Sequence, residues 1–262
     1  MNIIVCVKQV IDPEAPPASF KIDASSNKAE MKGAPPVIDP YGEFAVETAL
    51  RLKEAKGGKI TVISLGTNLL REVIKKPLAM GADELILLED EVFTKGDGWT
   101  TAYALATAIK KKGGFDLILC GREASDTNAG QTGPAIAEIL GLPCVVLARK
   151  IEQTDSQIKV EKVTSSGYDV IESPMPAVVT VSNEIGQSRY PTIKGIMAAK
   201  KIEPIIWKSG DIGFDTSIAS QRTKISKLFQ PVHEEKCEFA AGETPEEMAI
   251  NLATKLREAK IL

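Results

Sequence analysis

The sequence predicts an α/β protein: a Rossmann-like, doubly wound parallel sheet with an extended C-terminal arm that ends in a helix. Two observations carry this prediction. Apolar runs of strand length alternate with segments of helical period through the first 150 residues, and several of these runs are continuously apolar, as in strands buried on both faces. Such alternation favours parallel strands joined by right-handed crossovers. After residue 150 this pattern changes.

The first elements follow one another with clear stop signals. A strand is expected over residues 1–9, and a short hairpin over the first crossover, with residues 20–22 and 36–38 as its arms. Asp39 and Pro40 have the residue types of a helix cap and a first helical position. The next expected elements are a helix over 43–56, a strand over 59–65, a helix over 69–80, a strand over 84–88, a helix over 99–112 and a strand over 115–120.

Residues 117–143 are the stretch around which the chain is organised. A buried strand leads into GREASDTNAGQTG, a polar loop of thirteen residues, and Pro134 then opens a helix that stops at Gly141. Most connections from a strand to a helix have only about 2–6 residues. Because free N–H groups at a helix N-terminus attract phosphate, we interpret this loop as a nucleotide or phosphate site. A long but ordinary connection is the alternative, and the spacing matches neither GxGxxG nor a P-loop.

Three loops are expected to share one crevice. Ligands of open parallel sheets bind beyond the carboxyl ends of the strands, where the winding of the chain reverses. The expected strands end at Lys8, Leu65 and Gly121, so the loops that follow them would meet at the same edge of the sheet.

The C-terminal third has a different pattern. A strand is expected at 144–147, an antiparallel pair at 157–163 and 168–171, a strand at 177–181, and a short helix within TIKGIMAAKK, residues 192–201. We therefore predict a nucleotide-binding α/β domain over residues 1–204 and a C-terminal arm over 205–262. Thr244 and Pro245 open the last helix, whose apolar face carries Met248, Leu252 and Leu256. This arm is expected to dock on another chain, or alternatively to fold back on its own domain.

Composition excludes several classes of function. The 262-residue chain has a net charge of −3, which argues against nucleic acid as the main partner. No apolar run reaches the ~20 residues of a membrane span. Its four cysteines show no metal-ligand spacing, and Cys6, Cys120 and Cys144 stand in apolar runs, which favours a reducing, cytoplasmic compartment without metal ligands. The single histidine, His233, stands in a charged segment and is interpreted as a solvated side chain.

Over nearly its whole length the sequence resembles the β subunits of electron transfer flavoproteins. The resemblance runs through VKQVID, IDPYGEFAVETALRLKE and LAMGAD, and it is most specific in GREASDTNAGQTG and in PAVVT…RYPTIKGIMAAKK. It implies an adenine nucleotide alpha hydrolase-like domain in a heterodimer, whose α subunit carries the redox-active FAD. It also implies that this subunit holds AMP or, as in electron-bifurcating members, a second FAD that exchanges hydride with NAD.

The resemblance also implies a set of nucleotide-binding residues. Carried over position by position, these are Cys6, Asp39, Pro40, Tyr41, Gly42, Leu65, Gly121, Arg122, Glu123, Ala124, Ser125, Asp126, Thr127, Asn128, Ala129, Gly130, Gln131 and Thr132. Asp126, Asn128, Gln131 and Thr132 would supply polar side chains, and the backbone after Asn128 would meet phosphate. A turn residue that bonds its own backbone is the alternative for Asp126.

The resemblance also implies that the short helix after Pro191 meets a flavin dehydrogenase of the acyl-CoA dehydrogenase type. Ile193 would be an exposed aliphatic anchor, with Arg189, Lys194 and Lys200 as surrounding charges that steer the encounter. Ile196, Met197 and Ala199 are expected to pack inward or along the flank. The alternative is that Ile193 is a hydrophobic staple of its own helix.

Together these features predict an electron carrier rather than a stand-alone enzyme, one that transfers electrons from such dehydrogenases to a downstream acceptor. Three departures from the family pattern leave AMP and a second FAD both open: the loop reads SDTNAGQTG, the turn at 165–169 reads SSGYD, and Val163 stands where other members have an acidic residue. Asp97 and Thr100 resemble the residues with which electron-bifurcating members hold the NAD phosphates, but they equally suit helix capping. The alternatives are an ATP-binding or ATP-hydrolysing protein of the same topology, an NADH-oxidising bifurcating subunit, and a subunit whose pocket is empty.

Overall fold

The computed structural model describes residues 1–16, 19–23, 28–31, 33, 35–230 and 237–262. The chain forms two compact units, Met1–Lys227 and Leu228–Leu262. Residues 205–227, which the sequence analysis assigned to the arm, therefore pack with the α/β unit. His233 lies outside the described residues.

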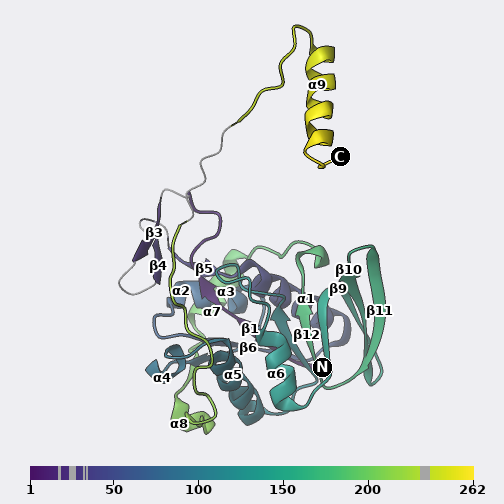
Figure 1. Cartoon of the computed structure of the whole chain (residues 1–262). Coiled ribbons are helices and arrows are strands. Elements are labelled where there is room, and N and C mark those ends of the chain that lie inside the picture. The colour runs from purple at the N-terminus through teal and green to yellow at the C-terminus, as the bar shows by residue number, and fades with distance from the viewer. Residues whose placement is uncertain (17–18, 24–27, 32, 34, 231–236) are drawn as a thin grey trace. The chain divides into compact units, whose positions relative to one another are not determined.

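The first unit is organised around a nine-stranded sheet in the order β11-β10-β9-β12-β8-β1-β6-β7-β13 (Figure 1). All neighbours from β9 to β13 in this order are parallel, whereas β10 is antiparallel to both β9 and β11. The winding reverses at β1, which pairs with β6 on one side and with β8 on the other, so the predicted doubly wound sheet is confirmed. Its strands are β1 (Asn2–Val7), β6 (Lys59–Leu65), β7 (Glu84–Leu88), β8 (Leu117–Gly121), β9 (Cys144–Thr154), β10 (Gln157–Thr164), β11 (Gly167–Pro174), β12 (Ala177–Val181) and β13 (Ile205–Trp207).

Helices cover both faces of the sheet. One hydrophobic core lies between the sheet and α1 and α3, and the other lies between the sheet and α5 and α6, which Figure 1 shows on the near face. Burial of one Val, Leu or Ile side chain stabilises the folded state by about 1.5–3 kcal/mol. Central strands such as β8 are covered by helices on both faces and therefore carry apolar residues on both. The helices of this unit are α1 (Pro40–Lys56), α2 (Arg71–Ile74), α3 (Lys76–Met80), α4 (Glu91–Thr94), α5 (Gly98–Lys112), α6 (Thr132–Leu140), α7 (Ile193–Lys200), α8 (Ser209–Ile212) and the 3₁₀ turn η2 (Asn183–Ile185).

The predicted pairing within the first crossover is wrong. β3 (Phe20–Asp23) pairs with β4 (Lys28–Met31), whereas β5 (Val37–Ile38) pairs with β2 (Gln9–Val10). Arms of two to four residues carry too little hydrophobic pattern to select a partner. The chain leaving β1 supplies that partner instead, because the Asp39 N–H donates to the Lys8 carbonyl at 2.8 Å.

Two other elements differ in extent from the prediction. The helix expected over residues 69–80 is divided into α2 and α3 at Lys75, because Pro77 has no N–H to continue the α2 ladder and suits the first turn of a new helix. The strand expected at 144–147 continues to Thr154, where it pairs with β10 beyond the end of its contact with β12.

Within residues 205–227, β13 pairs with β7 and Ile212 is buried in the core beside α5, and two aspartates attach further parts of the segment. Asp90 caps α4 and also accepts hydrogen bonds from the backbone N–H and hydroxyl of Ser209, at 3.1 and 2.7 Å. Asp97 caps α5 and also accepts from the N–H and hydroxyl of Thr223, at 2.7 and 2.9 Å. This segment lacks periodicity in the sequence because side-chain caps, rather than a hydrophobic stripe, hold much of it in place.

The second unit contains α9 (Pro245–Glu258), which confirms the predicted terminal helix. The Thr244 hydroxyl accepts from the Glu247 N–H at 3.2 Å, and Pro245 takes the first helical position. No residue of α9 is buried. Across the described parts of the chain, no helix is both long enough and apolar enough to span a bilayer.

Glu84 at the start of β7 predicts one component of acid sensitivity. Its Oε2 lies 2.9 Å from Lys59 Nζ, 2.9 Å from Lys112 Nζ and 3.1 Å from Thr61 Oγ1. Burial alone would raise the pKa of Glu84, but hydrogen bonds from Lys112, Lys59 and Thr61 outweigh it and lower the pKa to about 2. This pKa is below the ordinary value of 4.5 for glutamate. Ionised Glu84 therefore stabilises the folded state fully above pH 4.5, and this stabilisation is lost as the pH falls toward 2.

We therefore expect Glu84→Gln to lower the free energy of unfolding by about 2 kcal/mol at pH 7. The difference from wild type should shrink steadily in urea titrations between pH 4.5 and pH 3. The exposed Glu138 on α6 provides the control, and Glu138→Gln should change stability little at any pH. A Glu84→Gln deficit that stays constant down to pH 3 would contradict this assignment.

Candidate functional site

The carboxyl ends of β1 and β8 lie side by side at the point where the winding reverses. Cys6 and Cys120 are register partners in these strands, and both are buried. Leu65 ends β6, the neighbour of β1 on its other side. The structure therefore brings together the loops after β1, β6 and β8, as the strand order predicts. A hydrogen bond with Cys6 and burial both raise the pKa of the Cys120 thiol, so Cys120 is a poor candidate for a nucleophile.

Asp39 joins the start of α1 to the loop that follows β8. Its Oδ1 accepts from the Tyr41 N–H at 3.0 Å, which caps the helix, and its Oδ2 accepts from the N–H and hydroxyl of Ser125, both at 2.7 Å. Asp39 itself is buried. The cap is the one expected from the sequence, but the bond to Ser125 could not be read from it because the two residues are 86 positions apart.

The first turn of α1 packs directly on the end of β8. A Cβ atom on Gly121 would lie 2.6 Å from the Cβ of Tyr41, a separation that real side chains do not reach. Gly42 is buried against Val7, and the Arg122 guanidinium lies 5.6 Å from the centre of the Tyr41 ring. Gly121 thus permits α1 and the polar loop to share one edge of the sheet.

The loop over residues 122–131 has a defined internal structure. Its first residue, Arg122, donates its N–H to the Val181 carbonyl at 2.8 Å, and the Ala124 carbonyl accepts from Asn128 N at 2.8 Å. Asn128 and Gly130 have positive φ angles of 47° and 62°, which Asn and Gly tolerate better than other residues.

Charged side chains of this loop are paired. Both Asp126 oxygens lie 2.7 Å from Lys8 Nζ, which ties the loop to the end of β1. Arg122 Nε lies 3.2 Å from Glu123 Oε1. Asp126 thus bonds a neighbouring strand end rather than its own backbone.

The N-terminus of α6 opens at the end of this loop. Gln131 is the cap position, and its side chain makes no capping hydrogen bond. The N–H groups of the first turn, such as those of Thr132 and Gly133, are therefore suited to another acceptor. Pro134 needs none, since it has no N–H. An uncapped helix N-terminus beside a glycine-containing loop fits a phosphate group, which is the chemistry predicted for this loop.

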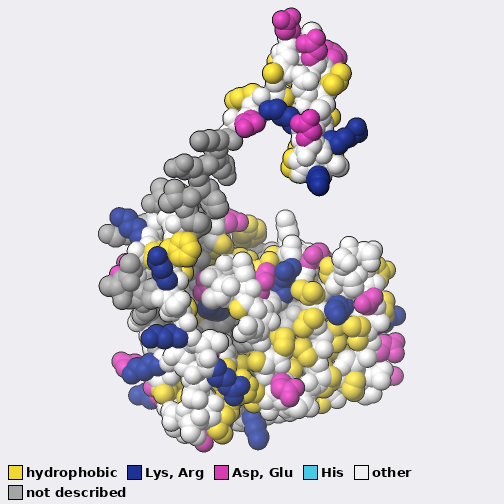
Figure 2. Space-filling model, in the orientation of Figure 1, with side chains coloured by type: hydrophobic (Ala, Val, Ile, Leu, Met, Phe, Trp, Pro, Cys, Tyr) yellow, Lys and Arg dark blue, Asp and Glu magenta, His cyan; other side chains and the backbone are white. Residues whose placement is uncertain are grey.

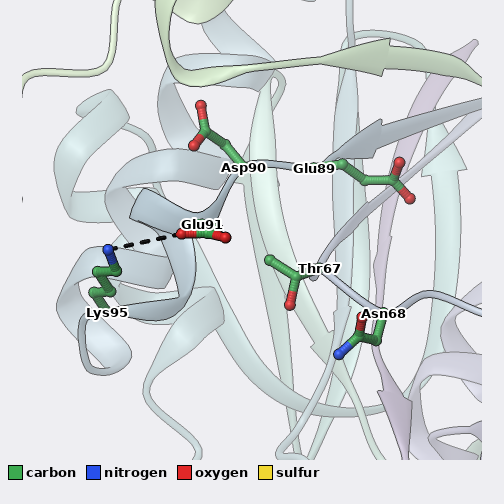
Figure 3. A pocket seen from close by; sticks show the side chains of 6 residues that line it. All are labelled: Thr67, Asn68, Glu89, Asp90, Glu91 and Lys95. Atoms are coloured by element: carbon green, nitrogen blue, oxygen red, sulfur yellow. Dashed lines mark ion pairs between the residues drawn. The ribbon is translucent and has the colours of Figure 1, made fainter.

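An acidic cavity of ≈ 470 Å³ lies beyond β6 and β7 (Figure 3). Its carboxylates already have partners: Glu89 pairs with Arg71 at 2.5 Å, Glu91 with Lys95 at 3.8 Å, and Asp90 holds Ser209. Excess negative charge disfavours a phosphate there, so the crevice at β1 and β8 is the better candidate site. The cavity is lined by Thr67, Asn68, Glu89, Asp90, Glu91 and Lys95.

Asp97 and Thr100, the possible NAD-phosphate pair, form a capping box at the start of α5. The second oxygen of Asp97 holds residues 222 and 223, and the Thr100 hydroxyl donates to the Ala219 carbonyl at 2.8 Å. Burial alone would raise the pKa of Asp97, but hydrogen bonds from Arg222, Thr100 and Thr223 lower it far below its usual range. The helix-cap interpretation of these residues is confirmed.

The surface around α7 is more apolar than the sequence suggested. Ile193 is 83% exposed and Tyr190 is 91% exposed. Ile196 and Met197 are also exposed, so of the two expected placements, inward or along the flank, the inward one is wrong for them, whereas Ala199 is buried as expected. The high exposure of Ile193 does not support a staple role. We name the four exposed residues Tyr190, Ile193, Ile196 and Met197 the α7 surface.

The charges around the α7 surface are not equivalent. Lys194 and Lys200 are exposed. The Arg189 guanidinium instead binds Glu54 and the buried Glu47, with its Nε 2.8 Å from Glu47 Oε2. Arg189 therefore holds its segment on α1 rather than standing as a free steering charge.

Cys144 at the start of β9, which was expected to be buried, is exposed.

A doubly wound parallel sheet with an open helix N-terminus at its switch point defines a Rossmann-like α/β protein. Comparison with known proteins narrows this class. The family described as the electron transfer flavoprotein domain matches residues 29–211. The chain belongs to the β-subunit family of electron transfer flavoproteins, whose role is electron transfer.

Three relatives align over the full length of both chains. The electron transfer flavoprotein subunit beta of Thermoanaerobacterium thermosaccharolyticum is 36% identical over 100% of each chain. The caffeyl-CoA reductase–Etf complex subunit CarD of Acetobacterium woodii is 35% identical over 100% of each chain. The electron transfer flavoprotein subunit beta of Bacillus subtilis is 33% identical over 100% of each chain.

The close contact between α1 and β8 at Gly121 can be tested directly by substitution. Gly121→Ala should push the first turn of α1 away from β8, because the new Cβ would also lie 2.9 Å from the Tyr41 carbonyl carbon. Overpacking of this kind costs about 1–3 kcal/mol, which should appear as a lower melting temperature. Gly210→Ala on α8 is the control, since nothing lies within 4 Å of its Cβ. Equal melting temperatures of Gly121→Ala and wild type would refute the tight contact.

Proposed function

We propose that this chain is the β subunit of a heterodimeric electron transfer flavoprotein, which carries electrons from a flavin dehydrogenase of the acyl-CoA dehydrogenase type to a downstream acceptor. The observation that carries the proposal is the full-length match to β subunits of this family, together with an uncapped α6 at the switch point of the sheet. The name of the Acetobacterium woodii relative places that protein in a complex with a reductase of a CoA thioester. The free cysteines of this chain are compatible with a reducing, cytoplasmic location.

The crevice of this subunit would hold an adenine nucleotide, either AMP or a second FAD. Its residues fit the phosphate part of both, because the donors are the N–H groups at the start of α6 and the glycine-containing loop before it. Gln131 and Asn128 would supply polar side chains beside that helix start. A flavin bound to the α subunit would supply the redox chemistry, and the role of this chain would be to hold and orient cofactors.

Releasing the bound ligand from the heterodimer by denaturation tests this proposal. The full-length chain is co-expressed with its α subunit, and the ligands freed by acid or heat are measured by absorbance and chromatography. One flavin and one AMP per heterodimer would support the AMP form. Two flavins would support the second-FAD form and an NADH-oxidising, bifurcating role. ATP alone, or a crevice without nucleotide, would overturn the proposal in favour of an ATP-binding protein or a structural subunit.

The second unit is proposed to dock on the α subunit. Met248, Ile250 and Leu252 of α9 are all exposed, and an amphipathic helix without a buried face is typical of a segment that packs on a partner. A further apolar region lies where Figure 1 places α6, β9 and β10, and Figure 2 shows hydrophobic side chains concentrated there.

Removing residues 240–262 should weaken the heterodimer while leaving the α/β unit folded. The loss of the apolar face of α9 is expected to lower the yield of α subunit that co-purifies with a tagged chain. As a control, Glu246→Gln and Glu247→Gln on the same helix change charge without removing apolar area. Stoichiometric co-purification of the truncated chain with flavin retained would count against the docking role.

Ile193→Ala should weaken docking to the dehydrogenase without destabilising the protein. Burial of an isoleucine side chain is worth about 1.5–3 kcal/mol, which corresponds to one to two decades in affinity. The measurement is the rate of electron transfer as a function of dehydrogenase concentration, with thermal unfolding run in parallel. Ile225→Ala is the matched control, since Ile225 is also exposed but lies outside the α7 surface. An unchanged concentration dependence for Ile193→Ala would remove Ile193 from the docking site.

A further inference from the structure

Helix α1 contacts both the crevice and the segment that leads into the α7 surface. At its N-terminus, Asp39 holds Ser125 of the loop, and the first turn lies on Gly121. Farther along, one flank of the helix holds residues 185–189, which connect η2 to the start of α7. The 17-residue helix is thus a rigid connection between two regions that the proposed function uses separately.

The flank of α1 binds this segment through a stripe of charged residues with helical spacing. Arg51 donates to the Ile185 and Gln187 carbonyls at 3.0 and 2.9 Å, and Glu43 accepts from the Ser188 hydroxyl at 3.5 Å. Glu47 and Glu54 hold the Arg189 guanidinium from the same side. These are the side chains of residues 43, 47, 51 and 54, which successive turns of a helix place on one face.

Glu47 is the centre of this stripe. It is 4% exposed and accepts from Arg51 Nε at 2.8 Å and from Arg189 Nε and N at 2.8 and 3.2 Å. Burial alone would raise the pKa of Glu47, but hydrogen bonds from Arg189 and Arg51 lower it. A buried carboxylate with this many donors fixes the backbone at Arg189, because the Arg189 N–H is itself one of the donors.

The other end of the segment is fixed by close packing. A Cβ atom on Gly195 would lie 2.2 Å from the Ala79 carbonyl oxygen, so α7 lies directly on α3. Between Arg189 and this contact, Tyr190 and Ile193 are exposed. The placement of the α7 surface therefore depends on two attachments, to α3 at Gly195 and to α1 at Glu47.

We propose that α1 couples the nucleotide crevice to the α7 surface, with Glu47 as the positioning residue that transmits the coupling through Arg189. This inference rests on the proposed function. A nucleotide that orders the loop over residues 122–131 would also order Asp39 and the start of α1, and hence the segment attached to its flank. Coupling of this kind is reciprocal, so a dehydrogenase docked on the α7 surface would also bind more tightly when the crevice is filled.

Amide hydrogen exchange of the full heterodimer tests the coupling directly. The protein is depleted of bound nucleotide and measured alone and with AMP, with FAD, and with adenosine, which lacks phosphate. We expect the nucleotide retained by the protein to slow exchange by several-fold both at residues 121–133 and at residues 185–200. The hairpin over residues 157–174, which forms one end of the sheet beyond β9, reports any general stabilisation and should respond less.

Two variants and one control locate the connection. In Glu47→Gln and Arg189→Lys, nucleotide should still slow exchange at residues 121–133, but its effect at 185–200 should be lost or reduced by more than half. The KM for the dehydrogenase should rise several-fold with kcat retained, and it should no longer depend on nucleotide. Arg149→Lys is the matched control, because Arg149 on β9 pairs with Glu161 at 3.3 Å and is not part of the charged stripe on α1.

Each outcome separates this inference from the proposed function. Slower exchange at residues 121–133 without any change at 185–200 would overturn the coupling and leave the nucleotide site intact. No response to AMP or FAD anywhere would refute the nucleotide site itself, and the coupling with it. A response at 185–200 that is equal in wild type, Glu47→Gln and Arg189→Lys would show that Glu47 does not transmit it, and the inference would be wrong.

Discussion

The carboxylate of Asp39 is the contact on which the candidate site depends, because each of its oxygens serves a different part of the chain. One oxygen caps α1, and the other binds the N–H and hydroxyl of Ser125. The same arrangement recurs at Asp90, which holds Ser209, and at Asp97, which holds Thr223. In all three cases a helix cap that would form in a short peptide also binds one Ser or Thr from a distant segment, through both its N–H and its hydroxyl.

This repeated arrangement explains how polar segments are fixed without a hydrophobic core of their own. The loop after β8 and the segment over residues 205–227 have few buried apolar residues, so each is attached to the sheet layer by charge-assisted hydrogen bonds to a helix cap. The helices are held by the sheet through extensive burial on both faces. The rigid part of the molecule thus orders the polar part, which carries the proposed chemistry.

The sequence predicts the parts of this structure that are encoded locally. Continuous apolar runs identify the central strands, and Asp39 and Thr244 identify helix starts, because a cap needs only its own helix. The second partner of each cap aspartate is not predicted, since Ser209 is 119 positions from Asp90 and nothing in the pattern relates them. The pairing of β2 with β5 was missed for a similar reason: two-residue strands contain no register information.

The α7 surface illustrates a different limit of pattern reading. Helical spacing shows which residues share a face, but not whether another element covers that face. Ile196 and Met197 were expected to pack inward or along the flank, and the close contact at Gly195 turns a different side of the helix toward α3 and leaves both exposed. The candidate crevice was predicted more fully, because strand order alone places the loops after β1 and β8 at one edge.

The exposure of α9 has a consequence for how the cell would regulate the amount of this chain. A 14-residue helix with no buried residue depends on one threonine cap and local pairs, and helices of this length are marginal in water without tertiary packing. In the unassembled chain this segment would open often and offer proteases an accessible substrate. If α9 docks on the proposed α subunit, folding of the last helix and assembly would be a single event, and surplus copies would be degraded first. Pulse-chase turnover with and without the α subunit would measure this, and equal lifetimes would exclude it.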